Sequence, residues 1–143
     1  MSRWDTLKDL VSIRERVNRL FEDVLGGVRE AGEVVGAWSP VVDIYETEKE
    51  FIVKAELPEV KQSDINIKVQ DHTLTIEGER KQQRAIEGYH RVERAYGRFT
   101  RSFLLPSSID QNVIKATLKD GILQIVLPKR VEILPRQIEI IEK

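Results

Sequence analysis

The sequence predicts an all-β domain, an immunoglobulin-like antiparallel β-sandwich, with an amphipathic helical arm before it and an extended tail after it. Between residues 41 and 128, apolar and polar residues alternate with a period of two, as they do in strands that bury one face. No helical period appears between these strands, which favours antiparallel pairing through short turns. The first 40 residues instead carry apolar side chains at three- and four-residue steps, the spacing of one helix face.

Prolines divide the chain, because a residue without an N–H group cannot continue a helix interior or a central strand. Pro40 separates the two periodicities, and Pro128 closes the last strong apolar run. We therefore expect three parts: an arm over residues 1–40, a sandwich domain over 41–128 and an extension over 129–143.

The arm is predicted to contain a helix that follows a capping box of Ser2 and Asp5 and ends at Gly26 and Gly27. Its polar side carries both signs of charge, whereas helices on membrane surfaces are usually dominated by Lys and Arg. Protein partners are therefore favoured, through packing inside an assembly, contact with exposed apolar segments of other proteins, or both. Residues 28–39 have no convincing period, and we expect them to be mobile. The apolar face of the helix consists of Trp4, Leu7, Leu10, Ile13, Val17, Leu20, Phe21, Val24 and Leu25.

Seven strands are expected in the sandwich domain. Asp120 and Gly121 between the last two are a strong hairpin signal, because both residue types tolerate the positive φ of tight turns. The expected strands cover residues 41–46, 51–57, 65–70, 73–77, 98–105, 113–119 and 122–127.

A long segment interrupts this plan. Residues 78–94 show no clear alternation, yet structureless loops longer than about 15 residues are uncommon inside compact domains. Residues 88–92 could form a short strand with nothing of their own domain within reach. Such a strand would be available to a second subunit.

The tail carries two apolar triplets, Val131-Glu132-Ile133 and Ile138-Glu139-Ile140. In an extended chain the two outer residues of a triplet point the same way. The ten residues after Pro128 reach at most about 33 to 36 Å, which is enough to cross to a neighbouring molecule.

The composition excludes several classes of chemistry. The chain has 143 residues and no cysteine, so disulfides, thiolate metal sites and cysteine nucleophiles are excluded. There is no nucleotide-binding glycine loop, no zinc-protease motif and no serine-hydrolase elbow. His72 and His90 are predicted to be surface residues rather than metal ligands. We expect no catalysis, no cofactor and no metal site.

A basic stretch with interleaved aromatic residues, from Arg80 to Arg101, could suggest nucleic acid. Against this, the chain has 23 Lys and Arg against 24 Asp and Glu, a formal net charge of -1. Arg101 falls on the same strand face as Phe99 and Phe103, where a guanidinium must find a carboxylate. We therefore expect Arg101 to form an ion pair at a subunit contact.

These residues resemble the small heat-shock proteins, the α-crystallin-related chaperones, over about residues 41–143. Residues 91–106, RVERAYGRFTRSFLLP, look like that family's E-R-x-Y-G-x-F-x-R-x-F-x-L-P segment. Residues 116–123, ATLKDGIL, are similar to its A-x-x-x-(N/D)-G-(V/I)-L signature, and residues 138–140 to its I-x-I tail. Residues 43–46 and 55–58 match the opening of its central domain.

The resemblance implies an α-crystallin domain that exchanges a short strand with a partner, as in bacterial and plant members. The residues it assigns to the dimer contact are Tyr89, His90, Arg91, Val92, Glu93 and Arg101. It implies that Ile138 and Ile140 anchor the tail in an apolar groove of another dimer, with Val131 and Ile133 as the alternative triplet. The groove would place Ile65, Ile67 and Val69 opposite Ile114, Ala116 and Leu118.

The function implied by the resemblance is that of an ATP-independent chaperone, a holdase that binds non-native proteins and prevents their aggregation under stress. Its partners would be itself, in a large homo-oligomer of strand-swapped dimers, and unfolded client proteins bound through residues 1–40. The absence of a signal sequence and of cysteine favours the cytoplasm. A non-catalytic adaptor on the same sandwich is the alternative, and a nucleic-acid binder is less favoured.

Overall fold

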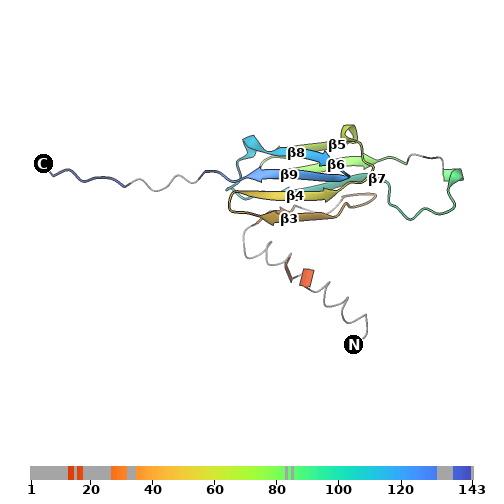
Figure 1. Cartoon of the computed structure of the whole chain (residues 1–143), viewed down its shortest axis with the longest axis horizontal. Helices are drawn as coiled ribbons and strands as arrows, with labels where there is room; N and C mark the ends of the chain where they lie inside the picture. Colours follow the sequence, from red (N-terminus) through yellow and green to blue (C-terminus); the bar gives the residue numbers. More distant parts are fainter. Residues whose placement is uncertain are drawn as a thin grey trace, which may run out of the picture.

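The computed structural model of the chain describes residues 13–14, 16–17, 27–31, 35–82, 84, 86–131 and 137–142. It contains two antiparallel sheets stacked face to face (Figure 1). One has the strand order β1-β7-β6-β5, with β2 also paired to β7, and the other has the order β3-β4-β9-β8. The predicted all-β sandwich is therefore confirmed. The strands are β1 (Arg29–Glu30), β2 (Val35–Gly36), β3 (Val42–Glu46), β4 (Glu50–Glu56), β5 (Ile65–Gln70), β6 (Thr73–Arg80), β7 (Gly97–Leu104), β8 (Lys115–Lys119) and β9 (Ile122–Pro128).

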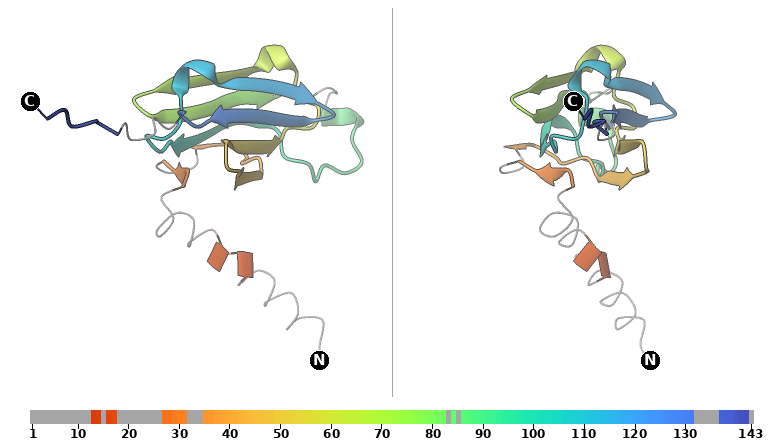
Figure 2. Two further views of the ribbon diagram at one scale, coloured as in Figure 1. Left: turned by 60° about the vertical axis from the view of Figure 1, so that its left-hand side comes forward. Right: turned by 90° about the vertical axis from the view of Figure 1, so that its left-hand side faces the viewer.

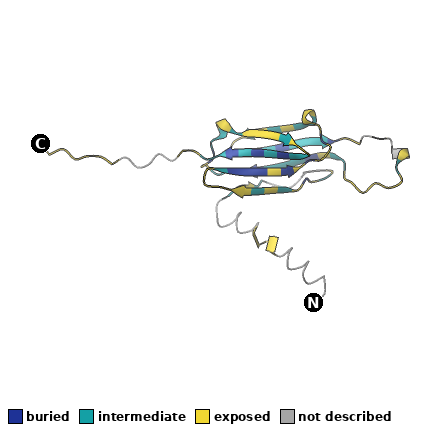
Figure 3. Ribbon diagram, viewed as in Figure 1, coloured by how far each residue is buried: buried dark blue, intermediate teal, exposed yellow. Residues whose placement is uncertain are grey.

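The core lies between the sheets and follows the period-two pattern of the sequence. In β9, Leu123, Ile125 and Leu127 are buried while the residues between them are partly exposed. Figure 3 shows the same concentration of buried residues in the central strands. Because burying one such side chain contributes about 1.5 to 3 kcal/mol, these alternating positions hold the two sheets together.

Two tight turns set the register of the hairpins. Asp120 and Gly121 join β8 to β9 with φ values of 53° and 78°, as the sequence predicts. Asp71 and His72 join β5 to β6 with φ values of 51° and 59°, although neither is a glycine. A slip of one residue at either turn would move the apolar set of a strand to the wrong face.

The segment before β3 differs from the prediction of mobility for residues 28–39. Val28 is buried in the core, and β1 and β2 pair with β7 (Figure 2). Each of these strands has two residues, which is too short for a period to show in the sequence. The five-stranded sheet therefore begins before residue 41, inside the part assigned to the arm.

Two strand ends differ from the expected boundaries by more than one residue, and three short 3₁₀ turns lie between strands. β6 runs to Arg80, whereas the predicted strand stops at residue 77. The prediction stopped early because Gly78 has no side chain to continue the alternation of apolar and polar residues. Val113 lies in a 3₁₀ turn rather than in β8. The turns are η1 (Gln62–Asp64), η2 (Ile86–Gly88) and η3 (Gln111–Val113).

Four residues of the predicted arm helix are described and all four are helical: Ile13, Arg14, Arg16 and Val17. The other apolar residues of that helix, Trp4, Leu7, Leu10, Leu20, Phe21, Val24 and Leu25, lie outside the described residues. In the part of the chain that the structure describes, no helix is long and apolar enough to cross a membrane.

Gly78 provides a test of how tightly the five-stranded sheet is packed. A Cβ atom there would lie 2.2 Å from the carbonyl oxygen of Asp64 and 2.8 Å from the ring of Phe99. Gly78→Ala should therefore lower the free energy of unfolding by about 2 kcal/mol, measured by urea denaturation at fixed protein concentration. Gly88→Ala is the control, because a Cβ at Gly88 meets nothing within 4 Å. Equal losses in the two variants would contradict the packing argument.

Candidate functional site

A groove runs between β5 and β8 on one flank of the sandwich. Among the described residues, each of these strands ends its sheet and pairs with one neighbour only, β6 and β9 respectively. The groove has a volume of about 480 Å³, and the side chain of Leu123 from the neighbouring strand β9 adds to its apolar lining. Its lining residues are Gln62, Ile65, Ile67, Ala116, Thr117, Leu118 and Leu123. We call this the β5–β8 groove.

Four of the six predicted groove residues, Ile65, Ile67, Ala116 and Leu118, come together in the β5–β8 groove. The remaining two, Val69 and Ile114, are partly buried against the hydrophobic core and are not among the groove's lining residues. Sequence reasoning missed Leu123 because it is a core residue of β9. Apolar walls beside two edge strands suit an extended peptide with branched side chains, since its backbone can pair with an edge while its side chains enter the groove.

The tail presents side chains of that kind. Ile138 is 83% exposed and Ile140 is 93% exposed. The tail runs away from the sandwich in Figures 1 and 3, and Val131 at its start is also exposed. Ile133 lies outside the described residues. The chain therefore carries both an apolar groove and an uncovered apolar segment that its own fold leaves apart.

Residues 81–96, which we call the exchange loop, project from the opposite end of the sandwich (Figure 1). Tyr89 is partly buried, and residues 90–93 are exposed. Arg91 and Glu93 form an exposed ion pair at 3.2 Å. Among the described residues of the loop, none pairs with a strand of the same chain. Residues 89–93 of the predicted interface thus lie outside the strands of the sandwich, whereas Arg101 belongs to β7.

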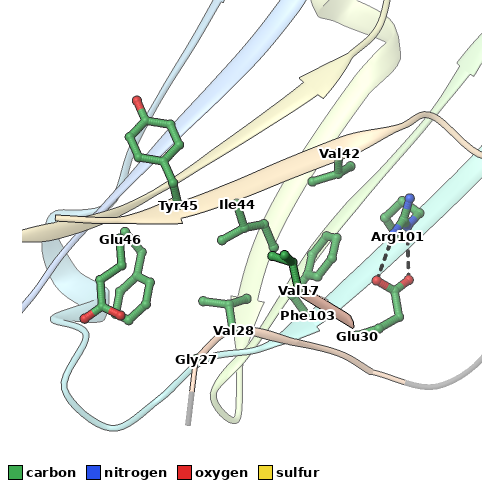
Figure 4. A pocket seen from close by; sticks show the side chains of 11 residues that line it. Val17, Gly27, Val28, Glu30, Val42, Ile44, Tyr45, Glu46, Arg101 and Phe103 are labelled. Carbon is green, nitrogen blue, oxygen red and sulfur yellow. Dashed lines mark hydrogen bonds and ion pairs between the residues drawn. The ribbon is translucent and has the colours of Figure 1, made fainter. Parts of the chain in front are cut away.

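A second flank lies between β3 and the β1–β7 pair, and it encloses a pocket of about 170 Å³ (Figure 4). Val28, Val42, Ile44 and Phe103 give it apolar walls, and Val17 of the arm also lines it. Val17 is 45% exposed and Ile13 is 53% exposed, so the described arm residues are only partly covered.

Arg101 lies at one side of this pocket and makes a two-pronged ion pair. Its Nε donates to Glu30 Oε1 at 3.0 Å, and its Nη2 donates to Glu30 Oε2 at 2.9 Å. Nη1 also donates to the carbonyl oxygen of Pro40 at 2.7 Å. From the sequence we expect this carboxylate at a subunit contact, whereas in the structure Glu30 of the same chain supplies it. Glu30 could not be anticipated because its approach depends on β1 pairing with β7.

Arg80 is a site residue that sequence reasoning missed. It is 6% exposed, although it belongs to a basic stretch that predicts a surface position. The period of two in β6 could have predicted this burial, because Arg80 follows Leu74, Ile76 and Gly78 on the inner face of the strand. Its guanidinium lies over the ring of Trp38, 4.2 Å from the ring centroid.

The two histidines lie apart from each other. His72 is at the β5–β6 turn with Nδ1 2.5 Å from Gln111 Nε2, and His90 is in the exchange loop. Among the described residues, no three His, Asp or Glu side chains gather where they could hold a metal ion. The expectation of no catalysis stays a prediction.

Comparisons with known proteins agree with this geometry. Residues 43–141 match the Hsp20/alpha crystallin family. Small heat shock protein C4 of Rickettsia felis is 41% identical over 104 residues, covering 71% of this chain and 64% of that protein. The 18.1 kDa class I heat shock protein of Arabidopsis thaliana is 36% identical over 115 residues, covering 78% of this chain and 71% of that protein.

A solved structure of a small heat-shock protein from Xylella fastidiosa, which shows a distinct high order structure, is similar with a TM-score of 0.68. It is 39% identical, and the match covers 74% of this chain and 99% of that chain. The chain spans just under two thirds of the Rickettsia relative, at 64% of its length. The family match thus covers residues 43–141, from β3 to the tail.

The Arg101–Glu30 pair is expected to stabilise the fold. Both side chains are mostly buried, at 17% and 25% exposure. A double-mutant cycle with Glu30→Ala and Arg101→Ala should therefore give a coupling energy of about 1.5 to 3 kcal/mol in thermal or urea unfolding. The exposed Lys68–Glu77 pair, at 3.6 Å, is the control and should give less than about 0.5 kcal/mol. A cost of Arg101→Ala that is the same with and without Glu30 would show that the pair is not coupled.

Proposed function

Because the chain belongs to the Hsp20/alpha crystallin family, we propose that it is an ATP-independent chaperone that holds non-native proteins and prevents their aggregation under heat or other stress. The observation that carries the proposal is the open β5–β8 groove in a chain whose own apolar tail is exposed. A protein that leaves such surfaces uncovered in one copy must cover them with another copy or with a client.

At rest, the tail of one dimer occupies the β5–β8 groove of another. Ile138 and Ile140 point the same way in an extended chain, and Ile65, Ile67 and Leu118 give the groove a matching apolar lining. Burying the two isoleucines contributes about 3 to 6 kcal/mol, which the ordering of the tail and the lost rigid-body freedom largely offset. Val131 and Ile133 remain the alternative anchor.

One tail therefore binds weakly, and many tails closing one shell act together. Each docking event after the first is effectively intramolecular, which raises the overall stability without any stronger contact. Single contacts open readily on heating, while the whole assembly persists. Grooves and arms released in this way become available to unfolding clients.

The dimer beneath this shell is built by strand exchange. β3 ends the four-stranded sheet and pairs only with β4, so its outer edge can accept a further strand. Residues 89–93 of a partner's exchange loop supply that strand. The relative from Xylella fastidiosa, with its high order structure, supports self-association of this chain.

Clients bind through the apolar face of the arm and through the opened grooves. Ile13 and Val17 are half exposed, and residues of this type bind the apolar segments that unfolding proteins present. The basic stretch favours nucleic acid less than the sequence alone implies, because Arg80 is buried and Arg101 is paired with Glu30. The cytoplasmic location stays a prediction.

Light scattering of a heated model client tests the proposed activity. We expect an excess of the purified full chain to suppress scattering without ATP and without a change when ATP is added. An adaptor would leave the scattering unchanged and would bind one folded partner at a fixed stoichiometry. Aggregation at equal rates with and without the protein would refute the chaperone proposal.

Assembly through the tail gives a separate prediction. Ile138→Ala combined with Ile140→Ala removes both anchor side chains, so sizing chromatography should show mainly dimers. Ile141→Ala is the matched control, because Ile141 is 79% exposed and lies outside the triplet. A large particle that survives the double substitution would show that this triplet is not the anchor, and Val131→Ala with Ile133→Ala would then test the alternative.

A further inference from the structure

Among the described residues, Arg80 is the only polar or charged residue that is buried. Neither the β5–β8 groove nor the pocket beside β3 explains its position. It ends β6, at the point where the chain enters the exchange loop. The side chain turns inward at 6% exposure, into the end of the sandwich rather than into solvent.

The guanidinium joins the two ends of the exchange loop. Its Nε donates to the carbonyl oxygen of Ala95 at 2.8 Å, and its Nη2 donates to the same oxygen. Nη1 lies 3.4 Å from the carbonyl oxygen of Pro58, in the turn after β4. Arg80 directly precedes the exchange loop and Ala95 is near the end of the loop, so these hydrogen bonds hold the two ends of the loop together.

The same guanidinium connects the loop to the segment that leads from the arm. Its carbon atom lies 4.2 Å from the ring centroid of Trp38 and 5.4 Å from that of Tyr96. Trp38 is itself fixed, because its indole N–H donates to the carbonyl oxygen of Gly97 at 2.8 Å. A lysine could not reproduce this arrangement, since it lacks both the planar face and the fork of donors.

Stability alone does not account for a buried arginine at this position. Within the described residues Arg80 makes no salt bridge, and burial lowers the pKa of its guanidinium, with the charge of nearby Arg94 acting in the same direction. Burying a charge without a carboxylate partner costs free energy, and an apolar side chain of similar size avoids that cost. The charged hydrogen bonds do, however, hold the carbonyl groups of Ala95 and Pro58 in a defined position relative to each other.

We propose that Arg80 is the positioning residue for strand exchange: by tying both ends of the exchange loop to Trp38, it sets the direction in which residues 89–93 leave the sandwich and couples that direction to the arm. The inference rests on the strand-swapped dimer of the proposed function. It assigns to Arg80 control over assembly rather than over folding.

The test uses full-length Arg80→Met, which keeps the length of the side chain and removes its hydrogen bonds and charge. We expect an unchanged strand spectrum in circular dichroism and a cooperative thermal transition. Subunit exchange between isotopically labelled and unlabelled protein, followed by native mass spectrometry, should be about tenfold faster than in the unmodified chain. Arg84→Met, an exposed basic residue of the same loop, should leave the exchange rate unchanged.

Trp38→Leu tests the coupling to the arm. It should also speed subunit exchange. Exchange in the double variant with Arg80→Met should be no faster than in Arg80→Met alone, because both substitutions remove the same contact between Arg80 and Trp38. Effects of the two substitutions that multiply would show that Trp38 acts independently of Arg80, which would overturn the coupling.

A folded Arg80→Met variant with unchanged subunit exchange would overturn the inference. If Arg80→Met does not fold, Arg80→Lys decides: faster exchange in a folded Arg80→Lys protein supports the positioning role, and unchanged exchange or loss of folding in both variants refutes it. Val92→Asp in the otherwise unmodified chain separates this from the proposed function. Intact dimers in that variant refute strand exchange itself, whereas lost dimers together with an insensitive Arg80 refute only the inference.

Discussion

The open edges of the two sheets are the constraint on which the rest of the structure depends. A sandwich of two short sheets has four edge positions, and each presents backbone N–H and C=O groups that can pair with another strand. This chain covers one of them itself, by laying β1 and β2 along β7. In the described part of the chain, no strand pairs with the outer edge of β3 on one flank or with the outer edges of β5 and β8 on the other. In the proposed assembly these edges are filled by other copies, because the same chain carries an extended tail and a projecting loop that can pair with them.

Two arginines hold the segment between the arm and the sandwich, and they do so in different ways. Arg101 binds Glu30 at the start of that segment and the carbonyl of Pro40 at its end. Arg80 packs against Trp38 between these two points. Apolar side chains could fill the same space at a lower cost in free energy, since they avoid the removal of charge from water. A guanidinium fixes the positions of its partners, because its N–H groups donate only to acceptors that lie near its plane.

The strands could be predicted because burial of one face imposes a period of two that is visible in any single strand, as in Leu123, Ile125 and Leu127. The groove residues Ile65, Ile67, Ala116 and Leu118 followed from the resemblance once these strands were in place. β1 and β2 could not be found, since two residues carry no period and their pairing depends on β7, about 70 residues away by the register Arg29↔Leu104. For the same reason the partner of Arg101 and the burial of Arg80 were missed, because both depend on contacts between distant segments. In addition, a basic stretch predicts that its charged residues lie on the surface.

In the proposed function, the weakness of each contact between tail and groove links assembly to client binding. If a tail bound its groove as strongly as a strand binds within the core, the shell would never open, and the groove would be lost to clients. A tail with two anchoring isoleucines lies near the point where burial and ordering offset each other, so that multiplicity decides whether the shell is closed. Heating shifts that balance at every contact at once, because the entropy of the free tail weighs more as temperature rises. The core resists the same heating because its side chains belong to one cooperative unit. In the proposed mechanism the sandwich therefore stays folded while the surfaces between its copies separate, and a protein that protects unfolding clients requires that order of events.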